Sequence, residues 1–213
     1  GISEFFHFWR RFFPNHDPEY LDRQQLCLVD VAGLRSELAG LQSFFGKPFM
    51  SKGMMLQYNI KFFAEQMKEL KFIHIKRNPE HVMQSIYEAR LRYYGTDNIW
   101  WSVKPRQFEK LQEMDVFAQI AGQVLFTDRE IKVQSEHLGA DRFVTVNYET
   151  LCERPKQCLS SIASAFSMPT IVQDLAMVND EYECSNRQRL DTKTMNELRQ
   201  YYRDLQRSGT FIT

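Results

Sequence analysis

The chain has 213 residues, and its 27 Lys and Arg balance 27 Asp and Glu, so the formal net charge is zero. Such a balance argues against a general nucleic-acid or anionic-membrane surface, but it leaves room for one small anion site. Hydrophobic residues make up 43% and charged residues 25% of the sequence, which is ordinary for a globular protein long enough to bury a core.

The cysteine pattern and the absence of targeting signals indicate in which cellular compartment the protein is expected. The four cysteines show no Cys-x-x-Cys spacing, and no Asn-x-Ser/Thr sequon occurs. No apolar run approaches the ~18–20 residues of a membrane span. We therefore expect a cytoplasmic protein with reduced thiols, without a disulfide framework, a metal site or a membrane span. The 17 Phe and nine Tyr are expected to fill the core, or in part to wall an apolar pocket.

The first third of the chain is expected to be helical. Residues 2–13 read as a helix with a serine cap, ended by Pro14, and residues 21–45 read as an interrupted helix that closes at Gly46. Apolar residues then recur at helical spacing over 56–70.

Two strands are expected further on, KFIHI at 71–75 and RFVTVNY at 142–148. The helices that accompany them are expected from about residue 80 to 94, from about 106 to 138, from Pro155 onward, and after a polar stretch at 178–193. Strands that alternate with helices predict an α/β fold with a parallel sheet.

Polar residues stand where these strands end. Parallel sheets bind ligands beyond the carboxyl ends of their strands, where Arg77, Tyr148 and Lys52 are expected to converge. A planar guanidinium there can bind a phosphate with two hydrogen bonds. The alternative is that Arg77 is an ordinary surface residue and that Ser85, eight positions later, is an ordinary helical serine.

The stretch KFIHIKRNPEHVMQS, residues 71–85, resembles the 3′-phosphate-binding segment of the PAPS-dependent sulfotransferases. In that family a strand ends in Arg, and a helical Ser follows eight residues later. The resemblance implies that Arg77 and Ser85 hold the 3′-phosphate of 3′-phosphoadenosine 5′-phosphosulfate (PAPS). Asn78-Pro79 stands where many relatives have Asp-Pro, which leaves both phosphate contacts in place.

A second match is RFVTVNYETLCERPKQCLSSIASAFSMP, which resembles the family's later strand, its Tyr-Glu-x-Leu and a Pro-led helix. It implies that Tyr148 lies near the adenosine end of the nucleotide; alternatively its ring simply packs and its hydroxyl finds a local partner. Glu149 is expected to serve local hydrogen bonding. Arg187 and Arg189 are implied to reach the 3′-phosphate, as a late basic stretch does in some relatives, or else to lie in a solvated loop.

A third match, PFMSKGMM, resembles the segment that carries the family's short strand and catalytic Lys. It implies that Lys52 stabilises the departing nucleotide, because a fixed ammonium offsets developing negative charge; the alternative is a solvated loop lysine. Cytosolic relatives place a catalytic His two residues later, where this chain has Met54. Other branches use a Glu from an earlier segment, which implies Glu4 as the base, unless it only complements the helix dipole.

The family's Gly-rich loop, which cradles the 5′-phosphosulfate at a helix N-terminus, has no counterpart in the sequence. We therefore expect residues 1–213 to form a single sulfotransferase-like domain without its first strand–loop–helix unit, a unit of ~30 residues. The resemblance implies a helix-rich three-layer α/β sandwich with a mainly parallel central sheet, similar to P-loop NTPases.

The expected reaction moves a sulfuryl group from PAPS to a hydroxyl or amine of a small-molecule, lipid or carbohydrate acceptor. The product nucleotide is 3′-phosphoadenosine 5′-phosphate (PAP), and neither a metal nor a nucleic-acid partner is implied. Two alternatives stay open. One is a non-catalytic nucleotide-binding or scaffold domain that kept only the 3′-phosphate site. The other is a P-loop kinase, which would need a Walker-type Lys and a carboxylate for Mg²⁺.

Overall fold

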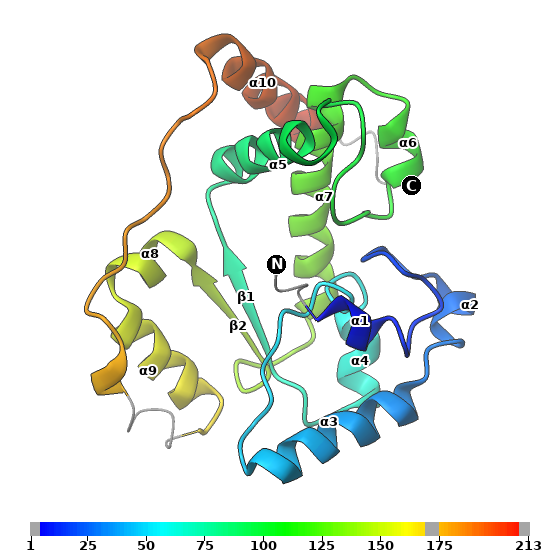
Figure 1. Cartoon of the computed structure of the whole chain (residues 1–213), viewed down its shortest axis with the longest axis vertical. Helices are drawn as coiled ribbons and strands as arrows, with labels where there is room; N and C mark the ends of the chain where they lie inside the picture. Colours follow the sequence, from blue (N-terminus) through cyan, green and yellow to red (C-terminus); the bar gives the residue numbers. More distant parts are fainter. Residues whose placement is uncertain (1–4, 169–174, 209–213) are drawn as a thin grey trace.

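Two short strands lie among many helices in the computed structural model, which describes residues 5–168 and 175–208 (Figure 1). The strands are β1 (Phe72–Lys76) and β2 (Phe143–Asn147). The helices are α1 (Phe6–Trp9), α2 (Arg23–Leu26), α3 (Val31–Phe45), α4 (Ile60–Gln66), α5 (Pro79–Tyr94), α6 (Phe108–Gln112), α7 (Val116–Ser135), α8 (Tyr148–Glu153), α9 (Pro155–Ala165) and α10 (Thr192–Ser208). None of these helices is long and apolar enough to cross a membrane.

The two strands pair in parallel, in a register that places Ile73 opposite Val144 and Ile75 opposite Val146. Parallel strands need a long crossover connection, and the chain from α5 to α7 supplies it. The expected α/β class is confirmed, and both strands lie within one residue of their predicted bounds. Over residues 5–168 and 175–208 the sheet has these two strands, so a three-layer sandwich around a central sheet is not seen there.

One face of the sheet is only partly covered. On β2, Val146 is buried and packs with Ile162 and Phe166 at α9. Its neighbours on β1 are open, since Ile73 is 38% and Ile75 is 53% exposed. Parallel sheets are usually buried on both faces. The described part of the chain therefore leaves an apolar strip of β1 uncovered.

The largest apolar cluster joins α5, α7 and α10, which lie together at the upper end of the strands in Figure 1. The helix expected over 106–138 is divided into α6 and α7, because the side chain of Asp115 accepts a hydrogen bond from Phe117 N–H and starts α7 anew. Gly122 permits the close contact between these helices, since a Cβ there would lie 2.3 Å from Leu111 Cδ2.

A second cluster fills the space between the N-terminal helices, and includes Trp9, Phe13, Leu34, Phe63 and Met67. The helices here are shorter than expected. The helix predicted over 2–13 is limited in the described residues to α1, and that predicted over 56–70 is limited to α4. The end of α3 is as predicted, because its C-cap is a glycine in the left-handed conformation, at φ 60°.

Arg142 ties the start of β2 to the end of α4. Its guanidinium donates hydrogen bonds to the carbonyl oxygens of Ala64, Met67 and Leu70, at distances of 3.0–3.2 Å. The last carbonyls of a helix have no partner within the helix, and a cation there also complements the helix dipole. Arg142 therefore fixes where the chain leaves α4 and enters β1.

We expect Arg142→Ala to lower the free energy of unfolding by about 2–3 kcal/mol, because hydrogen bonds from a charged donor are lost at three part-buried carbonyls. Arg142→Lys should recover part of this loss, since it keeps the charge but not the fork of donors. Urea unfolding at neutral pH measures both. Arg154→Ala is the matched control, since that exposed side chain pairs with its exposed neighbour Glu153 and should change stability by less than about 0.5 kcal/mol. Equal losses at both positions would contradict this role.

Candidate functional site

The parallel pairing brings Arg77 and Tyr148 together. Arg77 follows β1 directly, and Tyr148 is the first residue of α8, directly after β2. The guanidinium carbon of Arg77 lies 4.8 Å from the centre of the Tyr148 ring, a cation–π contact. The predicted convergence of these two residues at one edge of the sheet is confirmed.

An extended segment closes over this pair. Residues 182–190, which we call the strap, lead from behind α8 back to α10 and form the orange stretch of Figure 1. Arg77 Nε donates to Asn186 Oδ1 at 2.8 Å, and Arg77 Nη2 donates to the carbonyl oxygen of Ser185 at 3.0 Å. The Tyr148 hydroxyl lies 3.1 Å from Ser185 Oγ. The donors of Arg77 thus face neutral oxygen atoms that belong to the strap.

The strap is tethered to α5 by Gln84, whose side chain is fully buried. Gln84 Oε1 accepts hydrogen bonds from the backbone N–H of Arg189 at 2.6 Å and of Leu190 at 3.2 Å. Gln84 Nε2 donates to the carbonyl oxygen of Arg187 at 3.0 Å. A buried amide that satisfies three backbone groups fixes the path of the strap, since those groups would otherwise have no partner.

Glu149 joins the ends of both strands to the strap. Its Oε1 accepts hydrogen bonds from Asn78 N–H at 3.1 Å and from Asn186 Nδ2 at 2.5 Å. Partial burial alone raises the pKa of Glu149, but these hydrogen bonds and the charge of Arg77 outweigh it, so the pKa lies below its ordinary 4.5. This arrangement agrees with the expected role in local hydrogen bonding.

The two arginines of the strap differ in their surroundings. Arg189 forms a bidentate ion pair with Glu88 of α5, with Nε 2.8 Å from Oε1 and Nη2 2.5 Å from Oε2. The Arg187 side chain is exposed. Their predicted role at a 3′-phosphate stays a prediction.

Ser85 lies on α5, two turns beyond Arg77, and its hydroxyl donates to the carbonyl oxygen of His81 at 2.8 Å. His81 lies between them, and its Nδ1 is buried with no hydrogen-bond partner in the part of the chain that the structure describes. Burial and then the charge of Arg77 lower the pKa of His81 below its usual value. The imidazole is therefore neutral at pH 7, and it adds no charge to the site.

Of the two residues predicted to act in catalysis, the structure describes Lys52. Lys52 is exposed on the loop between α3 and α4, and the short strand that the resemblance implies at Phe49–Met50 is not formed. Lys52 therefore does not follow a strand, and its predicted convergence with Arg77 stays a prediction. Glu4 lies outside the described residues.

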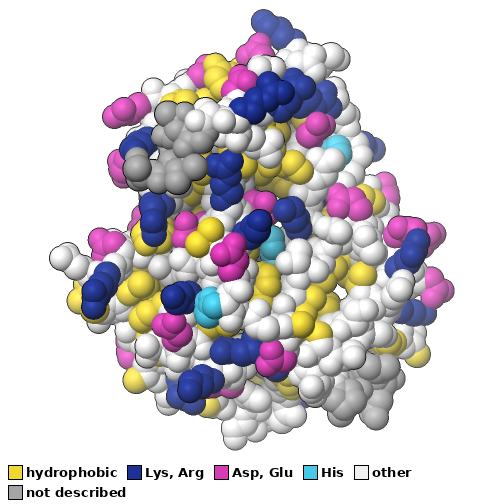
Figure 2. Space-filling model, turned by 180° about the vertical axis from the view of Figure 1, so that it is seen from behind, with side chains coloured by type: hydrophobic (Ala, Val, Ile, Leu, Met, Phe, Trp, Pro, Cys, Tyr) yellow, Lys and Arg dark blue, Asp and Glu magenta, His cyan; other side chains and the backbone are white. Residues whose placement is uncertain are grey.

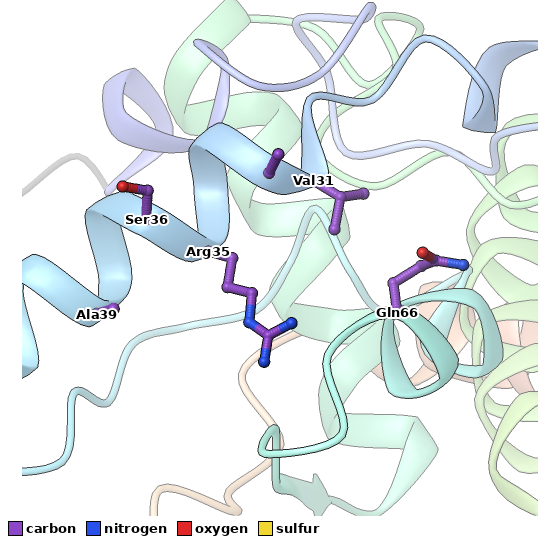
Figure 3. Close-up of a pocket in the computed structure, with 6 residues that line it drawn as sticks. Val31, Arg35, Ser36, Ala39 and Gln66 are labelled. Carbon is purple, nitrogen blue, oxygen red and sulfur yellow. The ribbon is translucent and has the colours of Figure 1, made fainter.

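The surface has a hollow of about 510 Å³ elsewhere, between α3 and α4 (Figure 3). Val31, Arg35, Ser36 and Ala39 of α3 line it, together with Gln66 at the end of α4. Its one charged side chain, Arg35, already pairs with Glu69 at 2.8 Å. This hollow offers no set of converging polar groups, and we therefore take the strand ends as the candidate site.

Away from the strand ends, positively and negatively charged side chains are mixed. On the rear face, Lys and Arg side chains are interspersed with Asp and Glu (Figure 2). Ion pairs such as Lys76 with Asp128 and Arg199 with Glu80 also join charges of opposite sign in the described part of the chain. Between residues 5 and 208, leaving aside 169–174, no three His, Cys, Asp or Glu side chains gather as ligands for a metal ion.

In comparisons with known proteins, no protein-family model, no curated protein and no solved structure matches the chain. The geometry at the strand ends and the residues themselves therefore carry the functional argument.

Sequence reasoning missed three residues of the site, namely Gln84, Ser185 and Asn186. Gln84 had a detectable signal, because it stands between the buried Met83 and Ile86 on α5, where a polar side chain needs a partner. Ser185 and Asn186 had none, since an irregular polar segment shows no periodicity that would place it over a strand end.

We expect Gln84→Met, which keeps the side-chain length, to release the strap, because three backbone groups lose their partner. Amide hydrogen exchange at Arg189 and Leu190 should accelerate by about tenfold or more, which corresponds to roughly 1–2 kcal/mol of local stability. The control is Glu183→Gln, at an exposed position within the strap. Unchanged exchange in Gln84→Met, or equal acceleration in both variants, would mean that Gln84 does not hold the strap.

Proposed function

We propose that this chain is a PAPS-dependent sulfotransferase domain. The observation that carries the proposal is the placement of Arg77 at the end of β1, beside Tyr148, with Ser85 two turns along the following helix. These are the residues that the sequence resemblance assigns to the nucleotide. In this proposal Arg77 and Ser85 hold the 3′-phosphate, Tyr148 lies at the adenosine end, and Arg187 and Arg189 approach the same phosphate from the strap.

The proposed reaction is an in-line transfer. An acceptor hydroxyl or amine forms a bond to sulfur while the bond between sulfur and the bridging oxygen of the 5′-phosphosulfate breaks. The acceptor's proton passes to a base, for which Glu4 is proposed, and the electron pair of the broken bond leaves with PAP. Lys52 stabilises the charge that develops on the bridging oxygen. The acceptor is a small molecule, a lipid or a carbohydrate, and no metal takes part.

The proposal also includes a fold that is larger than the two-stranded sheet and its helices. We propose that β1 and β2 belong to a three-layer α/β sandwich whose mainly parallel sheet contains at least one further strand beside β1. Two features support this: Ile73 and Ile75 are exposed, and the outer edge of β1 has no strand partner among the described residues. We also propose a reducing, cytoplasmic environment, which is consistent with four free cysteines.

Removal of the Arg77 guanidinium should abolish the preference for a 3′-phosphate. Calorimetric titration would compare PAP with adenosine 5′-phosphate, which lacks that group. We expect the wild type to prefer PAP, and Arg77→Ala to weaken PAP binding by roughly 30- to 150-fold, the equivalent of about 2–3 kcal/mol for a charge-assisted contact. Binding of adenosine 5′-phosphate should change little. Ser85→Ala should weaken PAP binding by about fivefold.

Arg154→Ala is the control for this titration, because it removes an exposed arginine that lies at the opposite end of α8 from Tyr148. Equal affinity of the wild type for the two nucleotides, or an unchanged PAP affinity in Arg77→Ala, would contradict the assigned phosphate site.

A second reading, a binding domain without turnover, is favoured by one observation: Lys52 lies on an exposed loop rather than at a strand end. The two readings differ in Lys52→Ala. If Lys52 stabilises the leaving group, this change should lower the rate of PAP release from PAPS by about 10²–10³-fold while PAP affinity stays constant.

Lys47→Ala, on the same loop, is the matched control and should leave the rate unchanged. Transfer to water serves as the assay, so that no acceptor has to be known. PAP binding without any release from PAPS would assign the chain to the binding-domain class.

A further inference from the structure

Four large apolar side chains are exposed together at the end of α3. We call them the aromatic tip: Phe44, Phe45, Phe49 and Met50. Their exposed fractions are 83%, 65%, 37% and 82%. Single exposed apolar residues need no explanation, but here four lie within seven positions of the chain, and the rings of Phe44 and Phe45 lie 5.0 Å apart, a grouping that marks an interaction surface.

Local structure holds the tip in place. Gly46 ends α3 in the left-handed conformation, so the chain reverses between Phe45 and Phe49. Phe49 is anchored from the protein side, with its ring 5.6 Å from the ring of Phe5 and 6.4 Å from that of Phe8. Phe49 therefore packs against Phe5 and Phe8, while Phe44, Phe45 and Met50 face solvent.

The charged residues that neighbour the tip along the chain have one sign. No Asp or Glu occurs between Glu37 and Glu65, and the charged residues in that interval are Lys47, Lys52 and Lys61. Over the whole chain the charges cancel, so this stretch is a local cationic region on a neutral protein. Exposed phenylalanines flanked by lysines are the composition that binds at the interface of an anionic bilayer.

We propose that the aromatic tip inserts into the interfacial region of a membrane that contains anionic lipids, with Lys47 at the level of the head groups. This inference does not depend on the proposed sulfotransferase function, because it uses neither Arg77 nor a nucleotide.

The shape of the surface favours a bilayer over a second copy of the chain. In Figure 1 the C-terminal end of α3 lies at the periphery of the molecule, away from α5, α7 and α10. With these exposed fractions, four side chains of roughly 150 Å² each expose about 400 Å², less than the ~800 Å² per partner of a standard protein interface. To bind a bilayer, the tip would need to enter the head-group boundary only to the depth of ~5–10 Å that apolar groups reach there.

Vesicle flotation tests the proposal, with vesicles of phosphatidylcholine alone and with added phosphatidylserine. We expect the wild type to bind the anionic vesicles more strongly than the neutral ones. The double change Phe44→Ser and Phe45→Ser should weaken this binding by at least about tenfold. Lys47→Gln should weaken binding to anionic vesicles by about fivefold and leave binding to neutral vesicles unchanged, since each lysine near such a surface contributes about 1 kcal/mol.

Leu28→Ser is the matched control, because Leu28 is 70% exposed on the separate loop between α2 and α3. It should bind vesicles as the wild type does. No binding of the wild type to anionic vesicles, or full binding by the Phe44/Phe45 double variant, would overturn the proposal. So would sedimentation that shows a dimer lost in the double variant without any vesicle binding, which would assign the tip to a second copy.

Discussion

The parallel pairing of β1 with β2 is the constraint on which the candidate site depends. Because Lys76 lies opposite Asn147, the next residues along the two strands, Arg77 and Tyr148, emerge side by side. Both strands turn at once into helices, and the hydrogen bond from Asn78 N–H to Glu149 Oε1 links the two helix starts. A shift of one residue in this register would send one of the two side chains to the opposite face.

The strap adds the remaining polar contacts to the site that the two strand ends form. It contacts α5 through Gln84 and Glu88, and the start of α8 through Glu149. Since the pKa of Glu149 is lowered in the folded protein, its carboxylate stabilises the folded state above pH 4.5, and this contribution is lost as the pH falls through the lowered value. At neutral pH Arg77, Glu149 and the strap therefore form one connected network of hydrogen bonds.

Periodicity and helix caps predicted the elements that depend on local interactions. β1, α5 and α9 were predicted because apolar alternation, or a proline at the first helical turn, identifies them in the sequence. The division of α6 from α7 was missed, since it depends on one Asp cap within a continuous apolar pattern. The strap was missed for another reason: Gln84 and Arg77 reach it across more than 100 residues, and no local pattern encodes such a contact.

The hydrogen bonds of Arg77 determine what a bound anion would have to displace. Its Nε and Nη2 donate to neutral oxygens of Asn186 and Ser185, in hydrogen bonds with one charged partner that are worth about 1.5–3 kcal/mol each, whereas a phosphate would add the attraction between two opposite charges. A phosphate would therefore gain on exchange with them. The Tyr148 ring lies on the face of the guanidinium, so it does not compete for the in-plane donors. Gln84 holds the strap from Arg187 onward, and displacement of Ser185 and Asn186 alone would leave that anchor intact. An anion at Arg77 would thus stay beside the strap rather than expel it.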